Sequence, residues 1–390
     1  MIRLVFSTPR RQGAKRPSRG NALDLSRHAD RLLPLTQNKK CFLFGSFLAS
    51  WRLGVLALCM AGLALPTIAQ DKPEAEPVEF QEITKELDKS VKKGLAYLAK
   101  QQNKDGSFDA DRYGGSHVGV TAICCLSFLA NGELPGRGEY GHVVQKGLDY
   151  ILANAQESGL IASENVSHGP MYGHGFATLF LGEVYGMTDD DDVRDALVKA
   201  VRIIVKSQNR EGGWRYHPVP YDADLSVTIC QIKALRSARH GGIDVPKETI
   251  EDAIQYVKDC QNIYDGGFRY RIGGGSSAFP RTAAGVASLY YAGVYEGDII
   301  KDGLKYLKDR IKTGEDRGGH EIYGHYYCSQ AMFIAGGEHW ADYYPKIRDR
   351  LIENQSVDGS WNSGHGGDYA TGMSLIILQM PYRLLPIFQR

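Results

Sequence analysis

From residue 84 onward, apolar positions follow a helical period, and two kinds of segment alternate along the chain. In the first kind, apolar residues recur every three or four positions and the opposite face is charged. This pattern is typical of a helix with one face on a core and the other in water. We expect such helices at 91–102, 144–156, 197–208, 250–261, 300–310 and 344–355.

The second kind of segment is apolar almost all the way round, as in VGVTAICCLSFLANG from Val118 to Gly132. A helix of this kind must be buried on every side. One such segment follows each of the six amphipathic ones. The alternation therefore predicts an all-α protein over residues 84–390, an α/α toroid in which six helical hairpins build an inner and an outer ring.

A short motif recurs at the end of the amphipathic segments. It reads QNKDGSF at 102–108, QNREGGW at 208–214, QNIYDGGF at 261–268 and QSVDGSW at 355–361, with weaker copies near Gln156 and Lys312. Glycine permits the positive φ that ends a helix sharply. We expect the glutamine side chain to bond the backbone of the turn and the aromatic ring to pack on the helix end. These residues therefore have a structural role.

Repeated Q-x-x-x-G-x-[WF] segments on paired helices resemble the QW repeats of squalene–hopene and oxidosqualene cyclases. They equally resemble the repeats of protein prenyltransferase β subunits. The resemblance covers residues 84–390 and implies the toroid fold, whereas it is much less specific for the reaction. Fold analogy alone also admits a polysaccharide lyase or a glycosidase, because six-hairpin toroids serve that chemistry too.

Residues 1–69 have the layout of a leader. They hold 11 Lys and Arg against two acids, and an apolar run from Leu53 to Leu65 precedes Thr67-Ile68-Ala69, a plausible cleavage site. This favours a secretory signal peptide, with an uncleaved membrane anchor counted from Cys41 as the alternative. Residues 70–83 read as a charged linker. We expect an exported or periplasmic protein, or one anchored to the outer side of the inner membrane through this leader.

The remainder of the chain is mildly acidic, with 35 Lys and Arg against 43 Asp and Glu. Nucleic-acid binding needs clustered positive charge, so no nucleic-acid partner is expected. The five cysteines beyond the leader are odd in number and form no CxxC pair, which favours buried small side chains. Nothing in the sequence indicates an oligomeric state.

Polar residues cluster at the heads of the expected inner helices. In a toroid these heads meet at one mouth, where a ligand site can form. We expect the substrate-binding residues to be His117, Tyr172, His174, Tyr221, Arg281, Tyr323, His325 and Asp368. Helix capping is the alternative explanation for the acids, including Asp224 and Asp368.

The segment Tyr221-Asp222-Ala223-Asp224-Leu225 resembles the DxDD motif with which class II terpene cyclases protonate an alkene. By this resemblance Asp222 and Asp224 form the acid site and Asp224 is the proton donor, which requires a raised pKa. The fourth position is Leu225, so the motif is incomplete. The implied ligand is a hydrophobic, isoprenoid-like molecule or lipid in the central cavity.

Prenyltransferases bind zinc through Asp, Cys and His. His325 matches the histidine by position, but Arg281-Thr282-Ala283 stands where D-x-C is required. We therefore expect no metal and no other cofactor. Three functions stay open: acid-initiated isoprenoid cyclisation, a non-catalytic exported toroid that binds a lipid or protein partner, and a glycan-cleaving enzyme in which His174, Arg281 and His325 bind a uronate.

Overall fold

The computed structural model describes residues 81–110, 115–164, 168–188 and 190–389. The predicted leader at 1–69 and most of the predicted linker lie outside these residues. Within them, no helix combines the length and the apolar composition that crossing a membrane requires.

The described chain is helical, and its helices alternate as predicted. The outer helices are α1 (Lys85–Gln101), α3 (Gly141–Ala153), α5 (Asp191–Ser207), α7 (Lys247–Asp259), α9 (Asp298–Thr313) and α11 (Gly337–Glu353). The inner helices are α2 (Val118–Leu129), α4 (Met171–Thr188), α6 (Leu225–His240), α8 (Phe279–Tyr291), α10 (Glu321–Ala335) and α12 (Gly367–Leu378). Two 3₁₀ turns follow, η1 (Met380–Tyr382) and η2 (Pro386–Phe388).

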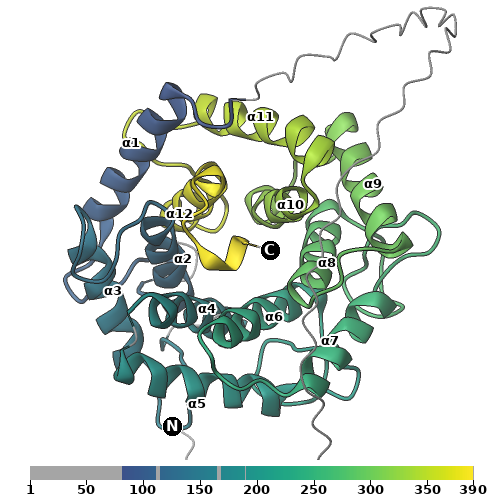
Figure 1. The fold of residues 1–390 in the computed structure, drawn as a ribbon, viewed down its shortest axis with the longest axis horizontal. Coiled ribbons are helices and arrows are strands. Elements are labelled where there is room, and N and C mark those ends of the chain that lie inside the picture. Colours follow the sequence, from purple (N-terminus) through teal and green to yellow (C-terminus); the bar gives the residue numbers. More distant parts are fainter. Residues whose placement is uncertain (1–80, 111–114, 165–167, 189, 390) are drawn as a thin grey trace, which may run out of the picture. The chain divides into compact units, whose positions relative to one another are not determined.

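The inner helices form a closed ring inside the ring of outer helices (Figure 1). Each inner helix packs on the next one along the chain, and α12 returns to pack on α2. Nearly every residue of α2 and α12 is buried, whereas the outer helices bury one face only. The predicted α/α toroid of six hairpins is confirmed.

In four of the six repeats, the motif glutamine joins its hairpin to the next outer helix. Gln208 Nε2 donates to the carbonyl of Gly212 in its own turn, at 2.8 Å, and to that of Thr249 in α7, at 2.9 Å. Gln102, Gln261 and Gln355 repeat the arrangement. The bond from Gln355 reaches Ser90 in α1, so the last repeat is tied to the first and the outer ring is closed.

The turn glycine is required for two reasons. Gly212 has φ of 92°, which L-residues rarely adopt. A Cβ atom there would also lie 2.2 Å from the carbonyl oxygen of Asp252 in the next outer helix. Gly159 in the weaker copy has the same features, with φ of 95° and Lys199 O at 2.4 Å. The copy near Gln156 therefore keeps the turn although its sequence has diverged.

The aromatic residue of each full motif is buried and bonded. Trp214 is fully buried, and its indole Nε1 donates to Ile204 O of α5 at 2.7 Å. Its backbone N–H donates to Thr228 Oγ1 of α6 at 3.1 Å. The equivalent threonines, each accepting from the backbone of the aromatic residue, are Thr121, Thr282 and Thr371. Each repeat thus bonds its turn to its own inner helix.

Candidate functional site

His174 occupies the threonine position of the second repeat. Its Nδ1 accepts from the backbone N–H of Ile161 at 3.1 Å, and its Nε2 lies 3.2 Å from Ala200 O of α5. The side chain is fully buried. Both ring nitrogens are thus engaged between α4 and α5, on the outer side of the inner ring. We do not retain His174 as a ligand-binding residue.

His325 also stands at the threonine position, in the repeat whose turn motif has diverged most. Its Nδ1 lies 3.0 Å from the Tyr343 hydroxyl of α11, and its Nε2 lies 3.2 Å from Asp316 Oδ2. Arg350 of α11 contacts the same nitrogen. This buried network replaces the glutamine turn and faces the outer helices, so His325 likewise leaves the set of candidate ligand-binding residues.

The role of His174 can be tested with the residue that the other repeats use. Burial lowers the pKa of His174 from 6.5 to about 4. Between pH 6.5 and 4, His174 is therefore protonated in the unfolded state but neutral in the folded state. The free energy of unfolding falls as the pH drops through this range. We expect the threonine of His174→Thr to keep the hydrogen bond to Ile161. The free energy of unfolding should fall by about 1–3 kcal/mol at pH 7.5, because the side chain is smaller. It should fall less on acidification than in the unmodified chain.

The measurement is urea unfolding of both proteins at pH 7.5 and pH 5. In His174→Thr, the loss of unfolding free energy between pH 7.5 and pH 5 should be reduced rather than abolished, because burial also lowers the pKa values of His117 and His325 to about 4. An equal acid-induced loss in His174→Thr and the unmodified chain would exclude this role for His174.

Asp224 lies at the mouth of the ring, at the head of α6. It is the N-cap residue of this helix, and its Oδ1 accepts from the backbone N–H of Val227 at 2.9 Å. The residue is fully buried, and its Oδ2 has no hydrogen-bond partner. The capping role proposed for Asp224 is confirmed, and the other carboxyl oxygen is buried 3.7 Å from Arg215 Nε.

Arg215 connects the two acids of the DxD segment. Its guanidinium group is ion-paired with Asp222, and its Nε lies 3.7 Å from Asp224 Oδ2 without a hydrogen-bond partner. Burial raises the pKa of Asp224 from 3.8 to about 6, although Val227, Tyr270 and Arg215 oppose part of this rise. Asp222 is 44% exposed and Tyr221 86% exposed. Tyr221 therefore lies on the surface beside the site.

Aromatic rings surround the Asp224–Arg215 pair. Arg215 lies over the ring of Tyr216, 4.9 Å from its centroid, and 6.0 Å from that of Tyr270. The hydroxyls of these two tyrosines are 2.6 Å apart, and Tyr172 of α4 lies 6.1 Å from Tyr216. The charge of Asp224 contributes to a raised pKa of Tyr172 after burial. Tyr216 and Tyr270 were not predicted from the sequence.

The other predicted residues are placed around the same end of the inner ring. His117 caps α2 through its Nδ1, which accepts from Gly119 N at 3.1 Å. Arg281 is half-buried in the first turn of α8. Asp368 lies inside the first turn of α12, not at its N-cap, and accepts from Asp109 N at 3.3 Å. The capping role proposed for Asp368 is therefore wrong, because Gly366 is the N-cap residue.

Side chains of α10 cross the interior of the inner ring. Tyr323 Oη donates to the carbonyl of Ser226 in α6 at 3.0 Å. Deeper in the ring, the Tyr327 hydroxyl lies 3.5 Å from Cys230 Sγ, and Lys233 Nζ donates to Tyr326 Oη at 2.8 Å. Tyr326 also packs against Phe176 of α4, with 6.2 Å between ring centroids. These side chains fill the space between α4, α6 and α10.

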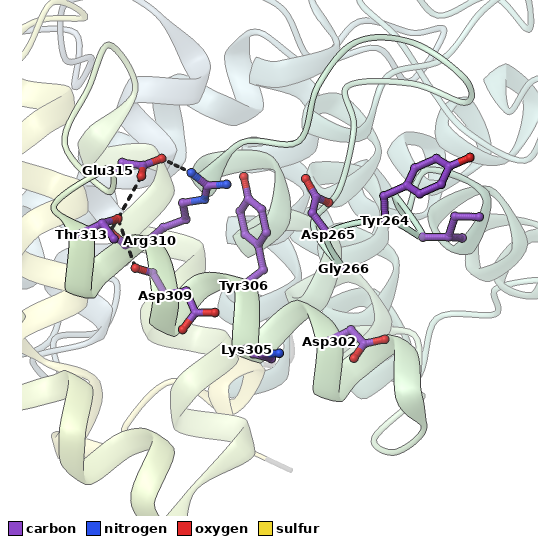
Figure 2. Close-up of a pocket in the computed structure, with 11 residues that line it drawn as sticks. Tyr264, Asp265, Gly266, Asp302, Lys305, Tyr306, Asp309, Arg310, Thr313 and Glu315 are labelled. Atoms are coloured by element: carbon purple, nitrogen blue, oxygen red, sulfur yellow. Dashed lines mark hydrogen bonds and ion pairs between the residues drawn. The ribbon is translucent and has the colours of Figure 1, made fainter.

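Two surface pockets lie away from the mouth. One, of about 420 Å³, lies between the 261–268 turn and α9, where Figure 2 shows Arg310 directed at Glu315 beside Tyr306. The other, of about 440 Å³, lies between α5 and residues 242–246. Neither includes a residue predicted for the site. Among the described residues, no group of three or more His, Cys, Asp and Glu side chains is arranged to hold a metal ion.

Solved structures with the same fold have diverse activities. An alpha-1,6-mannanase from a Salegentibacter species matches with a TM-score of 0.59 at 12% identity, over 76% of this chain and 99% of its own. The type II terpene cyclase MstE from Scytonema matches with a TM-score of 0.54 at 15% identity, over 77% and 100%. A protein from Actinoplanes matches with a TM-score of 0.54 at 15% identity, over 75% and 98%. These likenesses establish the fold alone.

No curated protein gives a significant match to the sequence. The family model described as the prenyltransferase alpha-alpha toroid domain matches residues 50–157 and 172–320. This is more than half of the chain, and it agrees with the repeated glutamine turns and the closed double ring. The protein belongs to the prenyltransferase alpha-alpha toroid family.

Proposed function

We propose that this protein is a non-catalytic, exported toroid that binds a hydroxyl-bearing, isoprenoid-like lipid at the mouth of its ring. The observation that carries the proposal is the filled interior between α4, α6 and α10. Hydrogen bonds join Tyr323 to Ser226 and Tyr326 to Lys233 across this space. A cyclase must fold a whole polyprenyl chain inside its ring, whereas the mouth here suits only one end of such a molecule.

The mouth offers a matched pair of contacts for a hydroxyl group. Asp224 Oδ2 and Arg215 Nε form a buried ion pair at 3.7 Å, and neither atom has a hydrogen-bond partner. A hydroxyl can donate to the first and accept from the second, which relieves the cost of leaving two buried polar atoms unpaired. The rings of Tyr172, Tyr216 and Tyr270 supply apolar faces for the adjoining carbon chain. Because Arg215 is 26% exposed, a ligand approaches from its side.

MstE supports a lipid of this kind by analogy, since structures of that enzyme are described in complex with geranylgeranyl dihydroxybenzoate as substrate. The substrate of that enzyme carries a geranylgeranyl group, and the present chain shares the fold. We infer that recognition of an isoprenoid is kept here while the chemistry is not.

Acid-initiated cyclisation is the second candidate, favoured by the burial of Asp224 and the rise of its pKa to about 6. At pH 7 such a group is protonated in only about a tenth of the molecules. Arg215 stabilises the ionised form, and the fourth position of the motif is the apolar, fully buried Leu225. These features favour a carboxylate that accepts a hydrogen bond over an acid that protonates an alkene.

The glycan-cleaving alternative is weakened because two of the three residues expected to bind a uronate are engaged elsewhere. The sequence assigned uronate binding to His174, Arg281 and His325, but both histidines are bonded to outer helices. The mannanase is described as inactive when two adjacent aspartates are replaced, whereas Asp222 and Asp224 are separated by one residue and share one arginine. The mouth therefore supports this function less well than lipid binding.

We expect Asp224→Asn to weaken prenol binding at least tenfold, because an amide at this position loses the charged acceptor. Asparagine caps helices about as well as aspartate, so the fold is retained. The matched control is Asp190→Asn, the N-cap residue of the outer helix α5. Binding is measured with geranylgeraniol by tyrosine and tryptophan fluorescence, and lipids are extracted from the purified protein for mass spectrometry.

The same incubations are analysed for products. Recovery of geranylgeraniol unchanged, with binding lost in Asp224→Asn and kept in Asp190→Asn, supports the proposal. Cyclised products that disappear in Asp224→Asn would establish catalysis instead. Equal affinity in all three proteins would place the ligand elsewhere, and no binding together with no co-purified lipid would end the proposal.

A further inference from the structure

The C-terminal segment of the described chain, Leu385–Gln389, lies inside the ring (Figure 1). It contacts the last turns of α4 and α6, at the end opposite the mouth. Leu385, Ile387 and Phe388 are each at most 4% exposed. Helix α6 contacts η2 directly. A segment buried in this way needs partners for its backbone groups.

Charged side chains of the inner ring supply those partners. Glu183 of α4, which is 2% exposed, accepts from Ile387 N at 3.1 Å and from Ser237 Oγ at 2.6 Å. Arg236 of α6 donates through Nη1 to Tyr290 O at 3.1 Å and through Nη2 to Gln389 O at 3.4 Å, while its Nε has no hydrogen-bond partner. Glu183 and Arg236 thus each bond the backbone of the C-terminal segment, and Arg236 also ties it to α8.

A third charged group lies under the aromatic residue of the segment. Lys233 is 1% exposed, and its Nζ lies 5.2 Å from the ring centroid of Phe388 and 4.6 Å from that of Tyr326. Gln330 Oε1 accepts from the same ammonium group at 2.7 Å. The lysine is therefore enclosed by aromatic rings, one of which belongs to the C-terminal segment.

We propose that this end of the ring is a peptide-binding pocket for an aromatic peptide segment, filled at rest by the protein's own Leu385–Gln389. Glu183 recognises a backbone N–H, Arg236 a backbone carbonyl, and Lys233 the aromatic ring between them. The same chemistry accepts the identical segment of a second copy of the chain. When the segment leaves, Lys233 becomes accessible from this side. The proposal is independent of the lipid site at the mouth.

The segment is joined to η1 through exposed residues, so a protease can reach this connection. Leu384 is 47% exposed, and the Arg383 side chain is 64% exposed. A specific protease site inserted between Arg383 and Leu384 lets the chain fold intact and then be cut. A second variant ends at Arg383. The probe is a fluorescein-labelled peptide of the sequence LLPIFQR, and its control carries alanine in place of phenylalanine.

We expect the peptide to bind the truncated chain and to exchange into the cut chain, with at least tenfold weaker binding of the alanine peptide. The uncut chain, whose pocket is filled, should bind the labelled peptide at least tenfold more weakly. Acetylation by acetic anhydride, read at Lys233 by peptide mass spectrometry, should be low in the uncut chain. It should rise after the cut segment is removed and fall again when the peptide is added.

Several outcomes would overturn the proposal. One is a cut or truncated chain that keeps its helical circular dichroism but binds the peptide no better than the uncut chain. Equal affinity for the phenylalanine and alanine peptides would show that the contact between the phenylalanine ring and Lys233 does not contribute to binding. Unfolding on cutting would make the segment an obligatory part of the core rather than an exchangeable ligand.

Discussion

Replacing Trp214 by alanine will lower the free energy of unfolding by about 3–5 kcal/mol, the usual cost of deleting a buried aromatic side chain. The indole is fully buried between α5 and α6, and its Nε1 bonds the Ile204 carbonyl at 2.7 Å. The variant therefore leaves a cavity and an unpaired carbonyl together. Urea unfolding followed by circular dichroism measures the loss.

Two further variants separate packing from hydrogen bonding. Trp214→Phe keeps a ring, as Phe108 and Phe268 do in other repeats, but leaves Ile204 O without its donor. We expect it to cost about 1–3 kcal/mol. Val357→Ala changes an apolar residue in the turn of another repeat that is 98% exposed, and should cost less than about 0.5 kcal/mol. A loss below 1 kcal/mol for Trp214→Ala would contradict the structural role of the turn motif.

The helices and turns could be predicted from the sequence because both depend on residues that are close together along the chain. An apolar period of three to four specifies each helix. Gln208 bonds Gly212 within its own turn, and Trp214 bonds Ile204 of the helix just before it. What the local pattern did not reveal is the second bond of each glutamine, to the next outer helix. That contact joins residues 41 positions apart, so no local pattern predicts it.

The site was less predictable because the equivalent positions of the inner helices are not evident from residue types alone. In the structure, His174 is equivalent to Thr121 and Thr228, whose side chains also accept from the backbone N–H at the motif's aromatic position. A usable signal was present: a threonine or histidine stands 13 or 14 residues after the aromatic position in the first four repeats. Aligned in this way, His174 is structural rather than ligand-binding.

The filled interior could not be inferred from residue types, because a tyrosine can line a cavity or occupy it. Tyr323, Tyr326 and Tyr327 are compatible with either arrangement until their partners are known. Lys233 is a charged residue in the buried middle of α6, whereas Arg239 and His240 are exposed in its last turn. Buried lysines are rare unless paired, and this one identifies the interior network and the pocket for the C-terminal segment.

The diverged fifth repeat gives the other large effect on stability. Asp316, whose side chain is 3% exposed, accepts from Arg350 Nη1 at 2.9 Å and lies 3.2 Å from His325 Nε2. Removing one partner of a buried charge pair typically costs about 3–5 kcal/mol, since the other charge is left unpaired. We expect a loss of this size for Asp316→Ala, although Glu321, 3.7 Å from Arg350, offsets part of it.

The pH dependence identifies the charge as the cause. Burial alone would raise the pKa of Asp316, but the contacts with His325 and Arg350 outweigh it and lower the pKa from 3.8 to about 2. A carboxyl group whose pKa is lowered on folding stabilises the protein above pH 3.8 and loses this contribution as the pH falls through 2. The difference between the unmodified chain and Asp316→Asn should therefore be equal at pH 7 and 5, and smaller at pH 3.

Urea unfolding at pH 7, 5 and 3 tests both statements, and Asp195→Ala is the matched control. Asp195 is 74% exposed and lies 3.7 Å from Arg194, so this surface pair should contribute less than about 1 kcal/mol. If Asp316→Ala costs no more than Asp195→Ala, the buried network does not replace the missing glutamine turn. If the Asp316→Asn difference is the same at pH 3 as at pH 7, lost packing rather than lost charge explains the effect.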